Sequence, residues 1–235
     1  ACGLQCPGPI LKMKKTMDSL VSGDRVEITS TDPGFPRDAA AWCSSTGNQL
    51  ISKEASGGKS VVIIEKGEPK ACNIVTSCEG KGKTFIMFSD DLDKALATFV
   101  LANGAAATGQ KVTIFFTFWG LNVIKKLHKP ETEKDIFGKM FGMMLPSSSK
   151  KLKLSKMSMG GIGGKMMRYI MNKKGIDSLE SLRQQALENG VEFIACQMSM
   201  DVMGVKQEEL LDEVTIGGVA TYMERADNAN VNLFI

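Results

Sequence analysis

The hydrophobic pattern of the chain changes once along its length, and this change constrains the fold more than any other feature. Residues 1–66 combine short helix-like and strand-like patterns, whereas residues 84–235 alternate strand and helix patterns. Residues 67–83, between the two, carry glycine, proline and lysine without an apolar period. The sequence therefore predicts two domains joined by a linker over residues 67–83, and 235 residues suffice for both.

The first block predicts a small α/β sandwich. Its first helix has an apolar stripe of Ile10, Leu11, Met13, Met17 and Leu20. The other expected elements are a strand over residues 25–29, a helix over residues 36–46, and strands over residues 49–54 and 60–65. The run Ser56-Gly57-Gly58 connects the last two strands as a hairpin. Two helices on one face of this sheet form a two-layer α/β sandwich.

The second block predicts a parallel sheet with helices on both faces. Strand patterns occur at residues 85–88, 111–118, 192–195 and 230–235. A helix capped by Asp90 or Asp91 follows the first of these strands, and Trp119-Gly120 begins another after the second. Strands that alternate with helices pair in parallel, and their helices cover both faces. We therefore expect a three-layer α/β domain over residues 84–235.

Residues 129–174 interrupt this alternation with an insertion rich in methionine. Its methionines are Met140, Met143, Met144, Met157, Met159, Met166, Met167 and Met171. Methionine forms adaptable apolar surface, so we favour a helical insertion that packs on the domain or on a neighbouring subunit. Membrane contact, suggested by the basic run at residues 150–154, is the less favoured alternative. Residues 160–165 do not form a phosphate-binding loop, because no strand precedes them and their glycine spacing differs.

Cys6 is the first candidate for a reactive thiol. It precedes Pro7 and Pro9, and proline suits the first turn of a helix because it has no amide hydrogen to leave unpaired. A helix N-terminus favours a thiolate over a thiol, and Lys12 and Lys14 add positive charge. We favour this reactive thiol over a buried structural cysteine, the alternative interpretation.

The residues around Cys6 resemble a family motif. The run Gly3-Leu4-Gln5-Cys6-Pro7-Gly8-Pro9 is similar to the Cys-Pro-x-Pro signature of the TusA (SirA-like) sulfur carriers. The resemblance continues through residues 23–26, 32–35 and 41–43. It implies that Cys6 carries a persulfide. The chain lacks an initiator methionine and most of a first strand, so we expect an excised piece or a numbering that omits leading residues.

Cys196 is the second candidate thiol. It directly follows the strand over residues 192–195 and precedes a helical stretch. Ligands of open parallel sheets bind beyond the carboxyl ends of the strands, so Cys196 is expected where such a site forms. Further residues are expected to wall this crevice: Phe118, Trp119, Gly120, Met198, Met200 and Met203. Spacing alone leaves a buried core cysteine equally open.

A second resemblance favours the acceptor thiol. Residues 102–105, 115–121 and 194–199 are similar to the DsrE/DsrF-like family of sulfurtransferases, in the branch that carries a Met-rich insertion. The resemblance implies a flavodoxin-like sheet, homo-oligomers and Cys196 as an acceptor of sulfur. Similar modules are found fused to rhodanese and flavin-dependent disulfide reductase domains, which implies partner proteins of these kinds.

Composition excludes several other functions. A net charge of +3, evenly spread, does not indicate nucleic acid as a partner. The single histidine, His128, precludes a histidine-rich metal centre, and we expect it at a helix C-terminus. No run is long and apolar enough to span a bilayer, and the N-terminus is no signal peptide, so we expect a cytoplasmic protein with reduced thiols. The cysteine spacings, including that of Cys72 and Cys78, do not match a zinc site.

These patterns together predict a sulfur-relay protein that needs no metal or organic cofactor. Cys6 receives sulfane sulfur from a donor persulfide and exchanges it with Cys196 or with partner thiols. One alternative is a redox switch in which Cys2 and Cys6 form a disulfide. The other is a non-catalytic scaffold that binds partners through residues 140–171. Cys43, beside Trp42, is expected to pack inside the sandwich.

Overall fold

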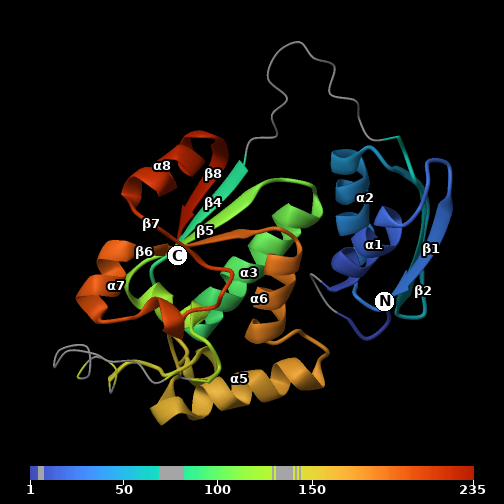
Figure 1. Ribbon diagram of the computed structural model, residues 1–235. Coiled ribbons are helices and arrows are strands. Elements are labelled where there is room, and N and C mark those ends of the chain that lie inside the picture. The colour runs from blue at the N-terminus through green and yellow to red at the C-terminus, as the bar shows by residue number, and fades with distance from the viewer. Residues whose placement is uncertain (5–7, 69–81, 129, 131–139, 141, 143) are drawn as a thin grey trace.

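The protein is described by a computed structural model that covers residues 1–4, 8–68, 82–128, 130, 140, 142 and 144–235. Two α/β domains lie side by side, with the N-terminal domain next to helices α3 and α6 of the C-terminal domain (Figure 1). Among the described helices, none combines the length and the apolar character that a bilayer crossing demands.

The N-terminal domain is a two-layer sandwich, as the sequence predicts. Its elements are α1 (Gly8–Asp18), β1 (Arg25–Ser30), α2 (Phe35–Thr46), β2 (Gln49–Ser56) and β3 (Lys59–Glu65). The three strands pair antiparallel in the order β1-β3-β2. Both helices pack on one face of this sheet, where Met13, Phe35, Trp42 and Ile64 belong to one cluster of buried side chains.

Local sequence signals explain the boundaries of these elements. Helix α2 ends because Gly47 adopts a φ of 80°, which lets its amide donate to the carbonyl oxygen of Cys43. The β2–β3 hairpin turns at Gly57 and Gly58, whose φ angles of 60° and 75° suit glycine at both positions.

The C-terminal domain is built on a five-stranded parallel sheet of order β7-β6-β5-β4-β8. Its strands are β4 (Gly82–Met87), β5 (Val112–Phe116), β6 (Glu192–Cys196), β7 (Thr215–Gly217) and β8 (Ala229–Phe234). Its α-helices are α3 (Leu92–Ala107), α5 (Ile162–Lys173), α6 (Leu179–Glu188), α7 (Gln197–Met203) and α8 (Val219–Asp227). The described part of this domain also contains the 3₁₀ helices η1 (Phe118–Ile124), η2 (Ser149–Lys151), η3 (Met159–Gly161) and η4 (Gln207–Glu209).

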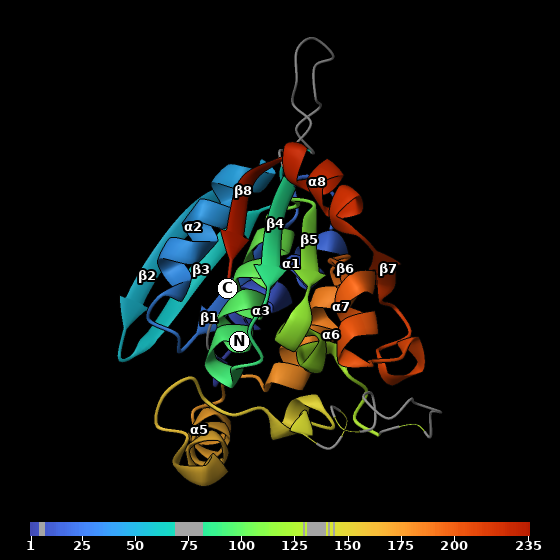
Figure 2. The same ribbon diagram turned by 90° about the vertical axis from the view of Figure 1, so that its left-hand side faces the viewer.

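Helices cover both faces of this sheet, which confirms the expected three-layer α/β architecture. Helices α3 and α6 cover the face on which Phe116 and Phe193 lie, and these side chains form the main core. Helix α8 covers the opposite face, where Phe115 and Tyr222 pack together. Figure 2 shows the five strands between the two helix layers. Successive side chains of a strand point to opposite faces of the sheet, so Phe115 and Phe116 pack against different layers of helices.

The helix expected from Trp119-Gly120 onward is the 3₁₀ helix η1, which begins at Phe118. One local expectation is wrong. His128 does not end a helix; it is exposed in a bend after an isolated bridge between Lys125 and Leu210. Helices of the 3₁₀ type recur at short connections, where α-helical periodicity gives little guidance.

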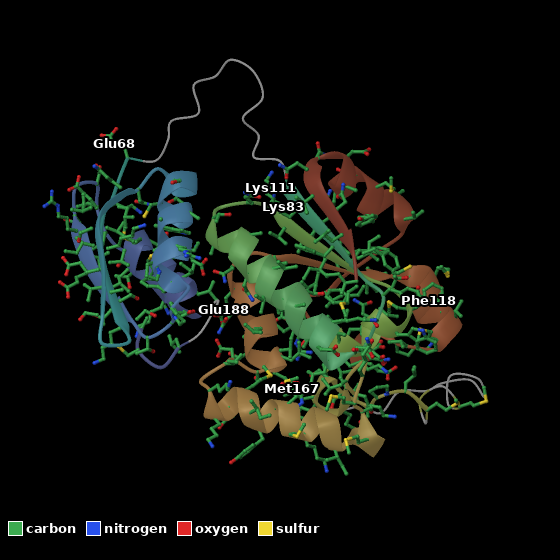
Figure 3. The ribbon with its side chains drawn as sticks, turned by 180° about the vertical axis from the view of Figure 1, so that it is seen from behind. Glu68, Lys83, Lys111, Phe118, Met167 and Glu188 are labelled. Carbon is green, nitrogen blue, oxygen red and sulfur yellow. The ribbon has the colours of Figure 1, made fainter. Side chains whose placement is uncertain are left out.

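The insertion contains helix α5, and its methionines differ in burial. Met171 is buried, and Met167 packs on the main core from the side of α5 that faces the domain (Figure 3). The other described methionines of the insertion are exposed: Met140, Met144, Met157, Met159 and Met166. Packing on the chain's own domain therefore accounts for only part of the described set, and contact with another subunit stays a prediction.

Candidate functional site

The first candidate thiol, Cys6, and its neighbour Pro7 lie outside the described residues. Helix α1 begins at Gly8, and Pro9 is buried in its first turn. No acidic side chain lies in that turn, and Lys12 and Lys15 are exposed on the helix that follows. The start of α1 therefore combines unpaired helix amides with positive side-chain charge, which favours anionic groups nearby.

Cys196 lies at the carboxyl end of β6, as the sequence predicts. It is the last residue of the strand and the N-cap of α7, and its backbone is extended there. Its side chain is 6% exposed and packs with Phe115, Ile194 and Tyr222 on the α8 face of the sheet. Tyr222 comes from α8, so this helix helps to bury the thiol.

The Phe118-Trp119-Gly120 turn lies at the neighbouring strand ends. Phe118 adopts a φ of 46°, which is uncommon for a residue other than glycine. Gly120 approaches β4 closely: its amide donates to the carbonyl oxygen of Phe88, and a Cβ atom at Gly120 would lie 1.9 Å from the carbonyl oxygen of Met87. Backbone strain of this kind recurs at functional sites.

Trp119 borders a cavity of about 650 Å³ at this edge of the sheet. Asp90, Lys151 and Lys153 line the same cavity, so acidic and basic side chains both lie around the Trp119 ring. The Trp119 side chain is 42% exposed. Cys196 does not line this cavity. Trp119 and Cys196 were expected to line one crevice, but in the described structure only Trp119 lines this cavity.

The three methionines of α7 that were expected to line one crevice do not lie together. Met198 is exposed, whereas Met200 and Met203 are buried in the core on the α3 face. Cys196 belongs to the cluster on the α8 face, so Met200 and Met203 do not pack around it. The hydroxyl groups of Thr117 and Ser199, 2.8 Å apart, join the end of β5 to α7.

A buried polar cluster beside the Trp119 cavity was missed by the sequence reasoning. Asn122 donates from its side-chain amide to Asp90 at 2.9 Å, and Asn122 is fully buried. Burial raises the pKa of Asp90, and the bond from Asn122 opposes this rise. Lys125, also buried, donates to the carbonyl oxygen of Pro146. Asp90 lies three residues after the end of β4 and was predicted only as a possible helix cap, whereas the N-cap of α3 is Asp91.

The other described cysteines differ in exposure. Cys43 is buried in the sandwich, as expected, and burial raises the pKa of its thiol to about 11. Cys2 is exposed, with its sulfur 3.9 Å from the carbonyl oxygen of Thr29. Cys72 and Cys78 lie outside the described residues. Within the part of the chain that the structure describes, no group of three or more acidic, thiol or imidazole side chains is arranged to hold a metal ion.

The architecture and the thiol at a strand end define a class of protein, and sequence comparisons identify it. Residues 80–234 match the DsrE/DsrF/DrsH-like family, to which the chain therefore belongs. Residues 1–66 match the family described as sulfurtransferase TusA. The chain is thus a TusA-like domain fused to a DsrE-like domain, which confirms both resemblances.

Relatives of each part are found among curated proteins. An uncharacterized protein of Bacillus subtilis, YrkE, is 44% identical over 155 residues, which is 66% of this chain and 97% of that protein. The sulfur carrier protein DsrE2 of Allochromatium vinosum is 37% identical over 161 residues, covering 67% of this chain and 99% of its own. The sulfur carrier protein TusA of the same organism is 42% identical over 66 residues, covering 28% of this chain and 87% of its own.

Proposed function

We propose that the protein relays sulfane sulfur, carried as a persulfide on Cys6 and exchanged with Cys196 or with partner thiols. The observation that carries this proposal is the fusion of two parts in one chain, each related to a protein named as a sulfur carrier. Membership of these families supports a relay role that involves partner proteins. The persulfide and the two named cysteines are the finer part of the proposal.

The local structure around each cysteine supports this chemistry. Cys6 precedes the start of α1, where helix amides and Lys12 favour a thiolate. Cys196 ends β6 at the edge of a parallel sheet where ligands of such folds bind. Its burial shields a persulfide from water and from competing thiols. The relay itself needs neither a metal nor an organic cofactor, because sulfur transfer between thiols requires only the two sulfur atoms.

The proposed partners are proteins that carry persulfides. A rhodanese-like protein or a flavin-dependent disulfide reductase would supply or accept the sulfur, and a reducing compartment such as the cytoplasm would keep the thiols free. The basic side chains on α1 suit a partner with an acidic surface.

Intact-protein mass spectrometry tests the proposal. The wild type, Cys6→Ser and Cys196→Ser are incubated with thiosulfate, polysulfide or a persulfidated donor protein. Each persulfide adds about 32 Da, and we expect the addition at each site to disappear with its own substitution. The same number of additions in both variants as in the wild type, or no addition to the wild type, refutes the carrier function. A loss of about 2 Da on oxidation would instead support the Cys2–Cys6 disulfide switch.

A further inference from the structure

The N-terminal domain packs against the end of helix α3. The Trp42 side chain donates from Nε1 to the carbonyl oxygen of Ala107, the last residue of α3. Ala107 is 1% exposed, and it belongs to the buried cluster of the N-terminal domain rather than to the core of its own domain. Its burial therefore depends on the contact between the domains. The backbones of the two domains also lie close together at Gly175, because a Cβ atom there would lie 2.0 Å from the carbonyl oxygen of Gly3.

Beside this contact, α1 and α6 border a groove of about 670 Å³. Lys12 and Lys15 of α1 line one wall, and Asp177 and Glu188 line the other. Figure 3 shows Glu188 on the side of α6 that faces the N-terminal domain. Among the described residues, no ion pair joins the two walls. Opposite charges across a water-filled groove attract each other weakly, and salt screens them over about 10 Å at 0.1 M.

This arrangement places the described residues on either side of residues 5–7 far from Cys196. Leu4 and Gly8 both line the groove on α6. Cys196 packs on the α8 face of the sheet, whereas α3 and α6 cover the opposite face. A layer of helices about 10–12 Å thick, and then the sheet itself, separates the two regions.

The ends of the strands are also remote from the groove. Figure 3 shows Phe118, which follows β5 directly, on the far side of the C-terminal domain from Glu188. Reacting atoms have to approach within about 3.5 Å for transfer. We therefore expect no transfer to Cys196 of the same chain while Leu4 and Gly8 lie on this groove.

We propose that the docked arrangement is a resting state, and that the N-terminal domain leaves α3 and α6 before its sulfur reaches Cys196. This inference rests on the proposed relay between Cys6 and Cys196. The face of α1 that carries Lys12 and Lys15 then binds one acidic surface at a time: the α6 wall of its own chain, or an acidic partner protein.

The transfer that follows release is balanced without an oxidant. The Cys196 thiolate attacks the outer sulfur of the Cys6 persulfide, and a sulfur–sulfur bond forms on Cys196. The sulfur–sulfur bond on Cys6 breaks, and Cys6 leaves as a thiolate. The proton of the persulfide stays on the transferred sulfur.

Ala107→Glu opens the interface from the α3 side, because Ala107 is buried in the cluster of the other domain and not in the core of its own. The matched control is Leu101→Glu, which places the same side chain on an exposed position of α3. Both are made in a Trp119→Phe background, so that Trp42 is the only tryptophan left of the two. We expect a red shift of the emission and at least twofold stronger acrylamide quenching in Ala107→Glu alone. Equal emission in both variants overturns the docking.

A milder variant guards against misfolding of Ala107→Glu. Glu188 is exposed, so Glu188→Lys preserves the fold and adds a fourth lysine to Lys12, Lys14 and Lys15 around the groove. We expect salt to weaken docking in the parent and to strengthen it in Glu188→Lys, as read from Trp42 emission between 0.05 and 1 M salt, a range over which the screening length falls to about 3 Å. The same salt response in both proteins contradicts the charge assignment.

Sulfur transfer supplies the functional readout, with Trp119 intact. Cys6 is loaded from a persulfide donor, and peptide mass mapping follows the appearance of sulfur on Cys196. We expect this rate to rise several-fold in Ala107→Glu and to remain unchanged in Leu101→Glu. A slower rate in Ala107→Glu means that the docked state is productive and overturns the proposal. If Cys6 takes up no sulfur in any variant, the relay function fails, while the fluorescence comparison still decides the docking.

Discussion

Gly120 shows how a single missing side chain shapes the edge of the sheet. The Phe118-Trp119-Gly120 turn folds back over the end of β4, and the space next to the Met87 carbonyl oxygen is too small for a Cβ atom. We expect Gly120→Ala to destabilise the protein by about 1–3 kcal/mol, because backbone rather than a flexible side chain has to move. Urea denaturation followed by circular dichroism measures this loss.

Gly104 provides the control for this substitution. It lies inside α3, and nothing lies within 4 Å of the Cβ position. Gly104→Ala should stabilise the protein by about 0.5–1 kcal/mol, since alanine favours a helix interior over glycine. Equal stability changes at the two positions would contradict the close approach at Gly120.

The thiols of Cys43 and Cys2 should differ in reactivity. Burial raises the pKa of Cys43 to about 11, so its thiolate fraction at pH 8 is about one in a thousand. We expect iodoacetamide at pH 8 to alkylate the exposed Cys2 and to leave Cys43 unmodified, as read by peptide mass mapping. Because the pKa is raised on folding, Cys43 contributes stability at pH below 9.0 that is lost as the pH rises toward 11. Alkylation of both thiols at the same rate would mean that α2 does not bury Cys43.

At the scale of single residues, the sequence predicted the place of a residue along its strand or helix better than the face on which its side chain is buried. It placed Cys196 at a strand end correctly, because the apolar run before it has the length of a buried strand. It also expected Met200 and Met203 beside that thiol, whereas α7 turns both into the main core. Which face a side chain takes depends on the rotation of a helix that is only seven residues long. The assignment of Cys6 and Cys196 to sulfur transfer stays a prediction.

Among the elements, α5 is linked to the domain through the hydrogen bonds of Arg168. Arg168 donates to Glu180 of α6 and to the carbonyl oxygen of Ser149, and the Ser149 hydroxyl donates to Glu180. Burial alone would raise the pKa of Glu180, but the bond from Ser149 and the charge of Arg168 outweigh it and lower the pKa. This anchor fixes the insertion beside α6 although much of α5 is exposed.

Arg168→Ala should loosen α5 specifically. A partly buried, charge-assisted contact of this kind contributes about 1.5–3 kcal/mol, so we expect amide exchange in α5 to accelerate about tenfold or more. The control is Lys165→Ala, which removes an exposed charge from the same helix. Acid should act in the same direction, since the contribution of Glu180 is present above pH 4.5 and is lost as the pH falls below it. Equal exchange rates in the two variants would show that α5 is held by its apolar contacts alone.

The predictability of the elements follows their length and their end signals. Helix α2 and the β2–β3 hairpin were predicted, because Gly47, Gly57 and Gly58 mark their turns. Strand β7, with three residues, is too short for a pattern, and the sequence reasoning did not propose α6 or α8. A helix was expected from Trp119-Gly120 onward, but its 3₁₀ type and the close approach of Gly120 to β4 are not visible in the sequence.

On the scale of the whole molecule, the fusion puts the TusA-like domain next to one face of the DsrE-like domain. The N-terminal domain rests on the α3 and α6 face, and Cys196 lies beyond the sheet. In the proposed relay, fusion raises the local concentration of one domain near the other, and release from α3 controls the reaction. In such an arrangement the strength of the interface sets how often the two thiols meet.

Trp42→Phe weakens that interface by a defined amount. Phenylalanine retains an aromatic ring in the N-terminal core but lacks the N–H group, so the Ala107 carbonyl oxygen loses its partner. A buried acceptor without a partner costs about 1–3 kcal/mol, which corresponds to roughly a tenfold shift toward the undocked state. We expect faster amide exchange at the end of α3, at Thr108 and Gly109, and unchanged exchange in β5 and β6. Faster exchange throughout the C-terminal domain would instead mean that the two domains unfold as one unit, with docking inseparable from the stability of the sheet.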